Sequence, residues 1–143
     1  MKKVLDIFAR KGRNTISIHP DATVLDALKL MADRNIGSVV VLHHEQYQGL
    51  MTERDYSRKV ILLGKSSSDT RVKDIMTTDL PRVSSEHTLE DCMELMSNKN
   101  VRYLPVFDHG RFSGIISIND VVRETISSQQ ETIEHLQNFI HSS

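Results

Sequence analysis

Two stretches of the sequence combine a hydroxyl and a carboxylate side chain in the same layout. Each reads glycine, two apolar residues, a hydroxyl residue, two further residues and an aspartate, in residues 49–55 and again in residues 114–120. A hydroxyl residue three places before an acid is typical of a helix N-terminal cap. A helix start also offers backbone N–H groups and a favourable dipole to an anion. The layout therefore indicates two capped helix starts that could also receive an anion.

The two stretches belong to a longer internal repeat. When the sequence is shifted by 65 residues, the separation of Thr23 and Thr88, identical residues coincide without a gap. The coinciding pairs are Thr23 and Thr88, Asp26 and Asp91, Leu30 and Leu95, Met31 and Met96, Asn35 and Asn100, Val41 and Val106, His44 and His109, Gly49 and Gly114, Asp55 and Asp120, and Arg58 and Arg123. Residues 4–8 resemble residues 72–76 at a slightly larger offset. The chain therefore contains two copies of one structural unit.

Each copy predicts the order strand, helix, strand, strand, helix. The strands are indicated by alternation or by β-branched apolar runs, and the helices by apolar residues at i, i+3, i+4 and i+7. The predicted elements are strands at 15–18 and 80–83, helices from Thr23 to Asn35 and from Thr88 to Asn100, strands at 38–42 and 103–107, polar turns at 43–46 and 108–111, strands at 47–51 and 112–116, and helices at 55–63 and 120–126. This order predicts an α/β fold.

The domain organisation follows from the repeat. We assign residues 1–64 to the first repeat, 65–70 to a linker rich in turn formers, 71–126 to the second repeat and 127–143 to an amphipathic C-terminal helix. The apolar side of that helix needs a partner, which is either its own domain or a second subunit.

Composition excludes several classes of function. A formal net charge of −1 with mixed signs gives no basic stripe for nucleic acid, and no apolar run is long enough to span a membrane. Cys92 is the single cysteine, which excludes an internal disulfide framework and a multi-cysteine zinc site. We expect a cytoplasmic protein that binds neither nucleic acid nor a membrane.

No set of residues predicts catalysis or metal binding. Gly64-Lys65-Ser66 resembles the end of a phosphate-binding loop, but the first glycine of that motif is replaced by Lys59. His43 and His44 have no accompanying ligand spacing, and Cys92 lies on the apolar face of a helix. We therefore expect no catalytic residues, no catalytic cofactor and no metal.

With these motifs in order and present twice, the sequence resembles the cystathionine-β-synthase-type (CBS) domain family over about residues 4–126. The family's repeats show an Asp-Ile-Met opening, a strand entry that begins at Asn and ends at Pro-Val, and the closing motif of the first paragraph. Here these are residues 74–76, residues 100–106 and the two stretches ending at Asp55 and Asp120. The chain is especially similar to small proteins made of one CBS pair, or Bateman module. The first repeat departs from the pattern at Phe8, at Val40 and at Gly37-Ser38.

The resemblance implies two β-α-β-β-α repeats that pack through their sheets with pseudo-twofold symmetry, and two clefts between them. Each cleft would combine the closing motif of one repeat with the first strand and strand entry of the other. The first would contain Thr52, Arg54, Asp55, Leu80, Pro81, Val101, Arg102 and Pro105. The second would contain Ser117, Asn119, Asp120, Thr15, Ile16, Ile36, Gly37, Ser38 and Val40.

The resemblance also implies a role for these residues. Asp55 and Asp120 would accept the two hydroxyl protons of a ribose, and aliphatic side chains would sandwich an adenine ring. Positive charge for phosphate would come from Arg54 and Arg102 in the first cleft, with Arg58 and Lys59 one helical turn further along. The second cleft has fewer charges, so tighter phosphate binding is expected at Asp55.

The function that the resemblance implies is non-catalytic regulation and signal transduction. AMP, ADP, ATP or NAD would bind as the regulatory ligand and alter contacts with an unknown effector protein, and the chain would form a homodimer. One alternative is a protein-interaction regulator with vestigial clefts and a thioredoxin-type partner. A nucleotide-processing enzyme is the other.

Overall fold

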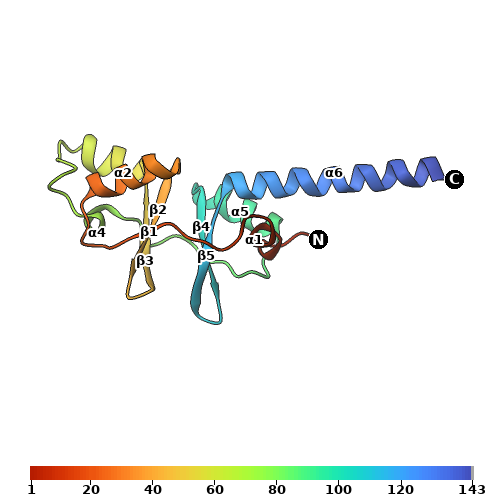
Figure 1. Ribbon diagram of the computed structural model, residues 1–143, viewed down its shortest axis with the longest axis horizontal. Coiled ribbons are helices and arrows are strands. Elements are labelled where there is room, and N and C mark those ends of the chain that lie inside the picture. The colour runs from red at the N-terminus through yellow and green to blue at the C-terminus, as the bar shows by residue number, and fades with distance from the viewer. Residues whose placement is uncertain (143) are drawn as a thin grey trace. The chain divides into compact units, whose positions relative to one another are not determined.

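The α/β fold is confirmed by the computed structural model, which describes residues 1–142. Ser143, which the sequence assigns to the C-terminal helix, lies outside the described residues. The chain divides into two compact units. The continuous unit is residues 14–80, and the composite unit joins residues 1–13 to the chain from Pro81 onward. The ribbon of Figure 1 shows both units and labels most of their helices and strands.

The continuous unit contains a three-stranded sheet in the order β1-β2-β3. β1 is parallel to β2, with Ile18 opposite Val41, and β2 is antiparallel to β3. The elements of this unit are β1 Ser17–Ile18, α2 Val24–Arg34, β2 Ser38–His43, β3 Gln46–Thr52, α3 Glu53–Tyr56, a π-helical turn η1 Ser57–Ile61, and α4 Val72–Ile75. The predicted helix at 55–63 is thus α3 continued by η1.

The composite unit has a two-stranded antiparallel sheet, β4-β5. Its elements are α1 Val4–Lys11, α5 Leu89–Lys99, β4 Tyr103–Asp108, β5 Arg111–Ser117 and α6 Ile118–Ser142. The strand predicted at residues 80–83 is wrong as a strand, because only Val83 pairs, in an isolated parallel bridge to Val106. Pro81 has no N–H to donate, which disfavours a regular ladder in this segment.

The two long repeat helices begin and end as the sequence predicts. The hydroxyls of Thr23 and Thr88 accept hydrogen bonds from the N–H groups of Asp26 and Asp91, both at 3.1 Å. Asn35 and Asn100 end the helices in the left-handed conformation, each with φ of 53°. Asparagine tolerates this conformation better than most residues, so the same cap closes α2 and α5.

Each unit takes its opening helix from the other sequence repeat. α1 belongs to the first repeat, yet its apolar residues complete the core of the composite unit. That core consists of Val4, Ile7, Phe8, Val83, Leu89, Cys92, Met96, Leu104, Val106, Ile116 and Val121. α4 belongs to the second repeat, and it completes the core of the continuous unit. That core consists of Val24, Ala27, Met31, Val39, Val41, Met51, Val60, Val72 and Ile75.

The glycine of each closing motif allows this exchange of opening segments. A Cβ on Gly114 would lie 2.8 Å from the ring of Phe8, and a Cβ on Gly49 would lie 2.7 Å from the backbone oxygen of Thr77. Cβ atoms do not approach other heavy atoms this closely, so both positions need glycine. In the continuous unit, backbone pairing fixes the close contact between Gly49 and Thr77, since Leu50 and Thr77 exchange hydrogen bonds of 3.0 and 2.8 Å.

The segment predicted as a linker is ordered against α2. The carbonyl of Thr70 accepts from the N–H of Val24 at 2.8 Å, and that of Ser67 accepts from the N–H of Leu25 at 3.0 Å. The hydroxyl of Thr70 donates to the carbonyl of Ser66 at 2.7 Å. These bonds satisfy N–H groups of the first turn of α2, which a helix cannot satisfy internally.

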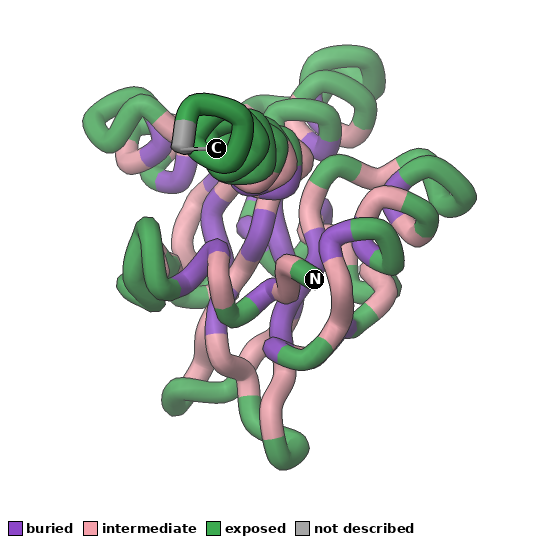
Figure 2. Tube along the Cα trace, turned by 90° about the vertical axis from the view of Figure 1, so that its right-hand side faces the viewer, coloured by how far each residue is buried: buried purple, intermediate pink, exposed green. Residues whose placement is uncertain are grey.

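The last helix of the second repeat and the predicted C-terminal helix are one element. α6 runs without a break across residues 126 and 127, as Figure 1 shows. Its first turns pack on the composite unit, where Val121 and Glu124 are buried. From Gln129 to His141 every residue of α6 is exposed, and this stretch is green in Figure 2.

Candidate functional site

Asp55 is a buried carboxylate at the start of α3 with both of its oxygens engaged. Its side chain is 6 % exposed. Its Oδ2 accepts from the backbone N–H of Thr52 at 2.9 Å, and the Thr52 hydroxyl accepts from the N–H of Asp55 at 3.1 Å. Its Oδ1 accepts from the hydroxyl of Thr77 at 2.8 Å and lies 2.9 Å from Nζ of Lys59. The cap interpretation of this motif is therefore confirmed.

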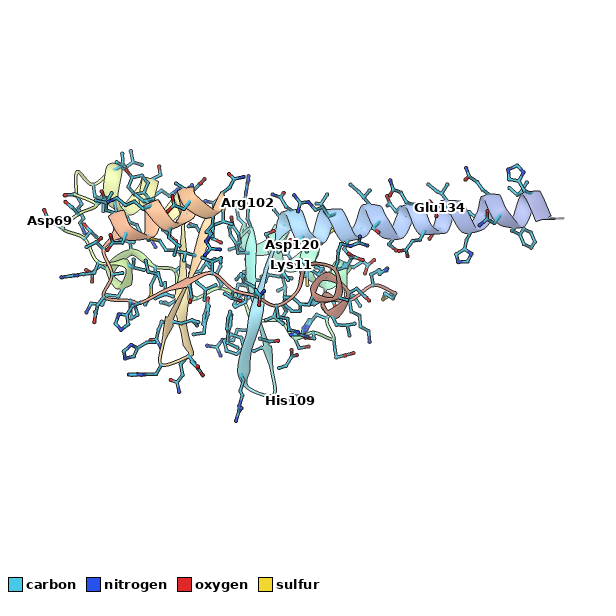
Figure 3. The ribbon with its side chains drawn as sticks, viewed as in Figure 1. Lys11, Asp69, Arg102, His109, Asp120 and Glu134 are labelled. Atoms are coloured by element: carbon cyan, nitrogen blue, oxygen red, sulfur yellow. The ribbon has the colours of Figure 1, made fainter. Side chains whose placement is uncertain are left out.

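Asp120 has the same cap geometry at the start of α6 but is more accessible. Its Oδ2 accepts from the N–H of Ser117 at 2.9 Å, and the Ser117 hydroxyl accepts from the N–H of Asp120 at 3.1 Å. Nζ of Lys11 lies 2.8 Å from the same Oδ2, and Figure 3 labels both residues. The side chain of Asp120 is 15 % exposed. Within residues 1–142, no hydrogen bond to its Oδ1 is found.

The two lysines make corresponding contacts. Lys59 donates to the carbonyl of Ile75 at 2.9 Å as well as pairing with Asp55. Lys11 donates to the carbonyl of Ile115 at 2.9 Å as well as pairing with Asp120. An ammonium group has three donors, so each lysine retains one N–H for an additional acceptor.

Each helix start is also tied to the strand entry of its own unit. The N–H of Glu53 donates to the carbonyl of Gly37 at 3.2 Å, and the N–H of Ile118 donates to the carbonyl of Arg102 at 2.8 Å. In the continuous unit the Gly37 carbonyl is therefore beside the Asp55 motif. In the composite unit the Arg102 carbonyl is beside the Asp120 motif.

The predicted cleft residues divide between the units according to their position in the chain. The continuous unit holds Thr15, Ile16, Ile36, Gly37, Ser38, Val40, Thr52, Arg54, Asp55, Arg58, Lys59 and Leu80. The composite unit holds Pro81, Val101, Arg102, Pro105, Ser117, Asn119 and Asp120. Val40 and Pro105 are buried, whereas Arg54, Arg58, Arg102 and Asn119 are exposed.

Several residues of these sites were missed by the sequence analysis. Lys11 is 109 residues from Asp120 along the chain, and Thr77 is 22 residues from Asp55. Glu124 was also missed: it is buried on α6, and its carboxylate accepts from Nε of Arg10 at 2.8 Å. The similarity of residues 4–8 to residues 72–76 was the available signal, since it marks α1 and α4 as equivalent elements.

Cys92 is fully buried, which confirms that it lies on the apolar face of its helix, and burial raises the pKa of its thiol to about 11. Such a thiol is a poor nucleophile at neutral pH.

In the described part of the chain, no group of three or more His, Cys, Asp or Glu side chains is arranged to hold a metal ion. Nor does any helix among residues 1–142 have the length and apolarity to cross a membrane.

Comparison with known proteins gives a consistent result over most of the chain. The family model for the CBS domain matches twice, at residues 3–61 and 72–127. The chain is 36 % identical over 146 aligned positions to the CBS domain-containing protein CBSX3, mitochondrial, of Arabidopsis thaliana, covering 96 % of this chain and 71 % of that protein.

Solved structures agree with this match. The crystal structure of the CBS domain protein NE2398 is 43 % identical, with a TM-score of 0.82, covering 87 % of this chain and 98 % of that one. The CBS domain pair of MJ0100 was solved in complex with 5'-methylthioadenosine and S-adenosyl-L-methionine. It is 22 % identical, with a TM-score of 0.77, covering 90 % of this chain and 98 % of that one, so it supports the fold alone.

Proposed function

Because the chain belongs to the CBS-domain family, we propose that it is a non-catalytic regulatory module that binds an adenosine nucleotide and passes the binding event to an effector protein. The ligand is AMP, ADP, ATP or NAD. The proposal keeps the two crossed residue sets that the sequence resemblance implies. The observation that carries it is the arrangement of Asp120, Ser117 and Lys11 at the start of α6.

The Asp120 arrangement has the chemistry that a nucleoside phosphate requires. The Oδ1 of Asp120, to which no bond is found within residues 1–142, can accept from a ribose hydroxyl. The third N–H of Lys11 can donate to a phosphate oxygen, and the positive end of the helix dipole adds to that attraction. MJ0100, which has this fold, was solved with two ligands that contain adenosine.

We infer that Asp120 is the better ribose acceptor, which reverses the ranking expected from the sequence. A ligand at Asp55 would have to displace the hydroxyl of Thr77 or the ammonium of Lys59 from a carboxylate that is 6 % exposed. A ligand at Asp120 would displace neither Ser117 nor Lys11. The charge deficit predicted for the second cleft is reduced by Lys11, whose ammonium lies 2.8 Å from Asp120.

The first experiment is thermal unfolding in the presence of adenosine, AMP, ADP, ATP and NAD. A ligand at one hundred times its Kd stabilises by about 2.7 kcal/mol. For a chain of this size that is a rise in Tm of about 5–10 °C. If none of the ligands raises the Tm, the proposal fails in favour of the interaction regulator with a thioredoxin-type partner. If the nucleotide is recovered chemically altered, it fails in favour of an enzyme.

Three variants locate the site. Asp120→Asn should abolish the shift, whereas Asp91→Asn, which alters the same cap position on α5, should not. Lys11→Ala should weaken AMP binding by about tenfold, which is 1.4 kcal/mol, and leave adenosine binding unchanged. Loss of the shift in Asp91→Asn, or an equal effect of Lys11→Ala on both ligands, would contradict the assignment.

The proposal includes a homodimer and a cytoplasmic location. Both come from the sequence and its resemblance, and sedimentation and cell fractionation test them. The relative from Arabidopsis thaliana is described as mitochondrial, so fractionation should include mitochondria where the host has them.

A further inference from the structure

The exposed side of α6 carries a regular apolar seam. Val122, Ile126, Ile133, Leu136 and Ile140 are between 44 and 67 % exposed. Together with Gln129 they are spaced 4, 3, 4, 3 and 4 residues apart. This is the alternation of the a and d positions of a heptad repeat, with isoleucines at a, and with valine, glutamine and leucine at d. The spacing suits another helix rather than a flat surface.

The composite unit occupies the side of α6 opposite to this seam. Glu124 and Glu131 are seven residues apart at the f position of the heptads. Glu124 pairs with Arg10, and Nζ of Lys2 lies 3.5 Å from both Glu124 and Glu131. The f position faces away from the a and d positions, so the contacts made by Lys2 and Arg10 do not cover the exposed Ile126, Ile133 and Leu136.

We propose that the seam is covered by α6 of a second copy of this chain, in a parallel, in-register two-stranded coiled coil. In parallel coiled coils, β-branched residues at a and leucine at d favour two strands, and here all three a positions are isoleucine and one d position is Leu136. In that arrangement Gln129 meets Gln129 of the other copy, and each amide can donate to and accept from its counterpart. In an antiparallel pair the glutamine would face an apolar residue.

Charge also favours a second copy of this chain. In the two C-terminal heptads the flanking e and g positions are neutral, being Gln130 and Gln137 at e, and Thr132 and Phe139 at g. Two copies therefore meet without like charges across the seam. A different partner would have no charged residue in these flanks to select it. The described seam from Val122 to Ile140 spans about 28 Å of helix, enough for nearly three heptads.

This inference rests on the proposed homodimer and specifies its interface, while the nucleotide proposal is independent of it. The test of orientation is disulfide cross-linking of the full chain under mild oxidation, with Gln129→Cys compared with Ser128→Cys. Cα atoms must lie within about 4.4–6.8 Å for a disulfide, a spacing that facing d positions can reach and outer positions cannot. Cys92 is buried, so the unmodified chain serves as the background.

The expected result is that Gln129→Cys cross-links at least about tenfold faster than Ser128→Cys. Equal rates, or no cross-link in either variant, would overturn the parallel coiled coil. The far-ultraviolet circular dichroism of both variants should match that of the unmodified chain, which shows that α6 remains helical.

A second measurement separates this interface from dimerisation through another surface. The combined change Ile133→Asn and Leu136→Asn should raise the dimer dissociation constant at least about tenfold in sedimentation experiments. The matched control is Glu134→Asn with His135→Asn, two exposed residues outside the seam. A dimer that both variants form equally well would overturn the coiled coil and leave the homodimer itself standing.

Discussion

In the continuous unit, the lysine that pairs with the helix-start aspartate lies four residues along the same helical segment, whereas in the composite unit it comes from α1 at the other end of the chain. Lys59 and Asp55 are therefore held together by local structure. Lys11 reaches Asp120 only when α1 is docked. In both units one lysine ammonium group contacts a carboxylate and a backbone carbonyl. These contacts depend on local folding in the continuous unit and on tertiary packing in the composite unit.

The two units also differ in how α1 and α4, the helices that open the two sequence repeats, are docked. In the continuous unit Thr77, two residues after the end of α4, pairs with Leu50 of β3 through the backbone, and Gly49 is packed against the Thr77 oxygen. In the composite unit α1 is a full turn longer, and Gly114 is packed against the ring of Phe8. A backbone contact cannot be relieved by changing a side chain, and a ring contact can. This difference can be tested directly.

The largest effect is expected from the two glycines. Gly49→Ala should cost about 3 kcal/mol, because its Cβ meets a backbone oxygen that is fixed by hydrogen bonds. Gly114→Ala should cost about 2 kcal/mol, and adding Phe8→Leu should recover about 1 kcal/mol, because the smaller side chain makes room for the new Cβ. Guanidinium denaturation measures all three. The comparison fails if Gly49→Ala is tolerated, or if Phe8→Leu adds its own cost to that of Gly114→Ala.

An acid-dependent difference should distinguish the units next. Asp108 of β4 accepts from the Ser85 hydroxyl at 2.5 Å and from the Ser85 N–H at 2.9 Å, and these bonds lower its pKa below the usual 3.8. The equivalent residue in the continuous unit is His43, which contacts His19 instead. Because the pKa of Asp108 is lower in the folded than in the unfolded chain, its carboxylate stabilises the fold at pH values above the unfolded pKa. This contribution is lost as the pH falls through the folded pKa.

Asp108→Asn should therefore cost about 1–2 kcal/mol at neutral pH, and progressively less as the pH falls below 3.8. Urea denaturation of the variant and the unmodified chain between neutral pH and strong acid measures the difference. Asp33→Asn, on the exposed side of α2, is the control for loss of one negative charge. A pH-independent difference would show that the Ser85 bonds do not depend on the charge of Asp108.

The smallest effect is expected in the hairpin turns. Both turns use two residues of positive φ, which are His44 and Glu45 between β2 and β3, and His109 and Gly110 between β4 and β5. Glutamate at φ of 63° is strained where glycine at 76° is not. Glu45→Gly should raise the free energy of unfolding by up to about 1 kcal/mol, and Gly110→Ala should lower it by about as much. Two changes of the same sign would contradict this account.

Much of the fold could be predicted from the sequence because it depends on local patterns. The spacing of apolar residues, Thr23 and Thr88 before the helices, and Asn35 and Asn100 after them, are enough to place α2 and α5. The strand predicted at residues 80–83 does not form a ladder. The sequence could not reveal this, because alternation alone does not show whether a segment has a pairing partner along its length. The boundary drawn between residues 126 and 127 does not coincide with a helix end, because α6 continues from Ile118 to Ser142.

The sites could be predicted only in part, for a related reason. The hydroxyl and the aspartate of each closing motif are three residues apart, so the cap contacts follow from spacing. The contacts of Lys11, Thr77 and the buried Glu124 depend on which unit α1 or the segment after α4 joins. The periodicity of the sequence carries no information about that choice. A glutamate is also exposed in most proteins, so burial of Glu124 becomes apparent only when Arg10 is placed beside it.

The composite unit also has a consequence for the order of events during synthesis. All the residues of the continuous unit emerge in one stretch, and this unit can close before the rest of the chain exists. Residues 1–13 leave the ribosome before the rest of the composite unit, and α1 finds its site only after Asp120 has followed Lys11 by 109 residues, which takes about 5–20 s at usual rates of elongation. During that interval the apolar side of α1 has no native surface to cover it, so a chaperone that engages emerging chains can bind at α1.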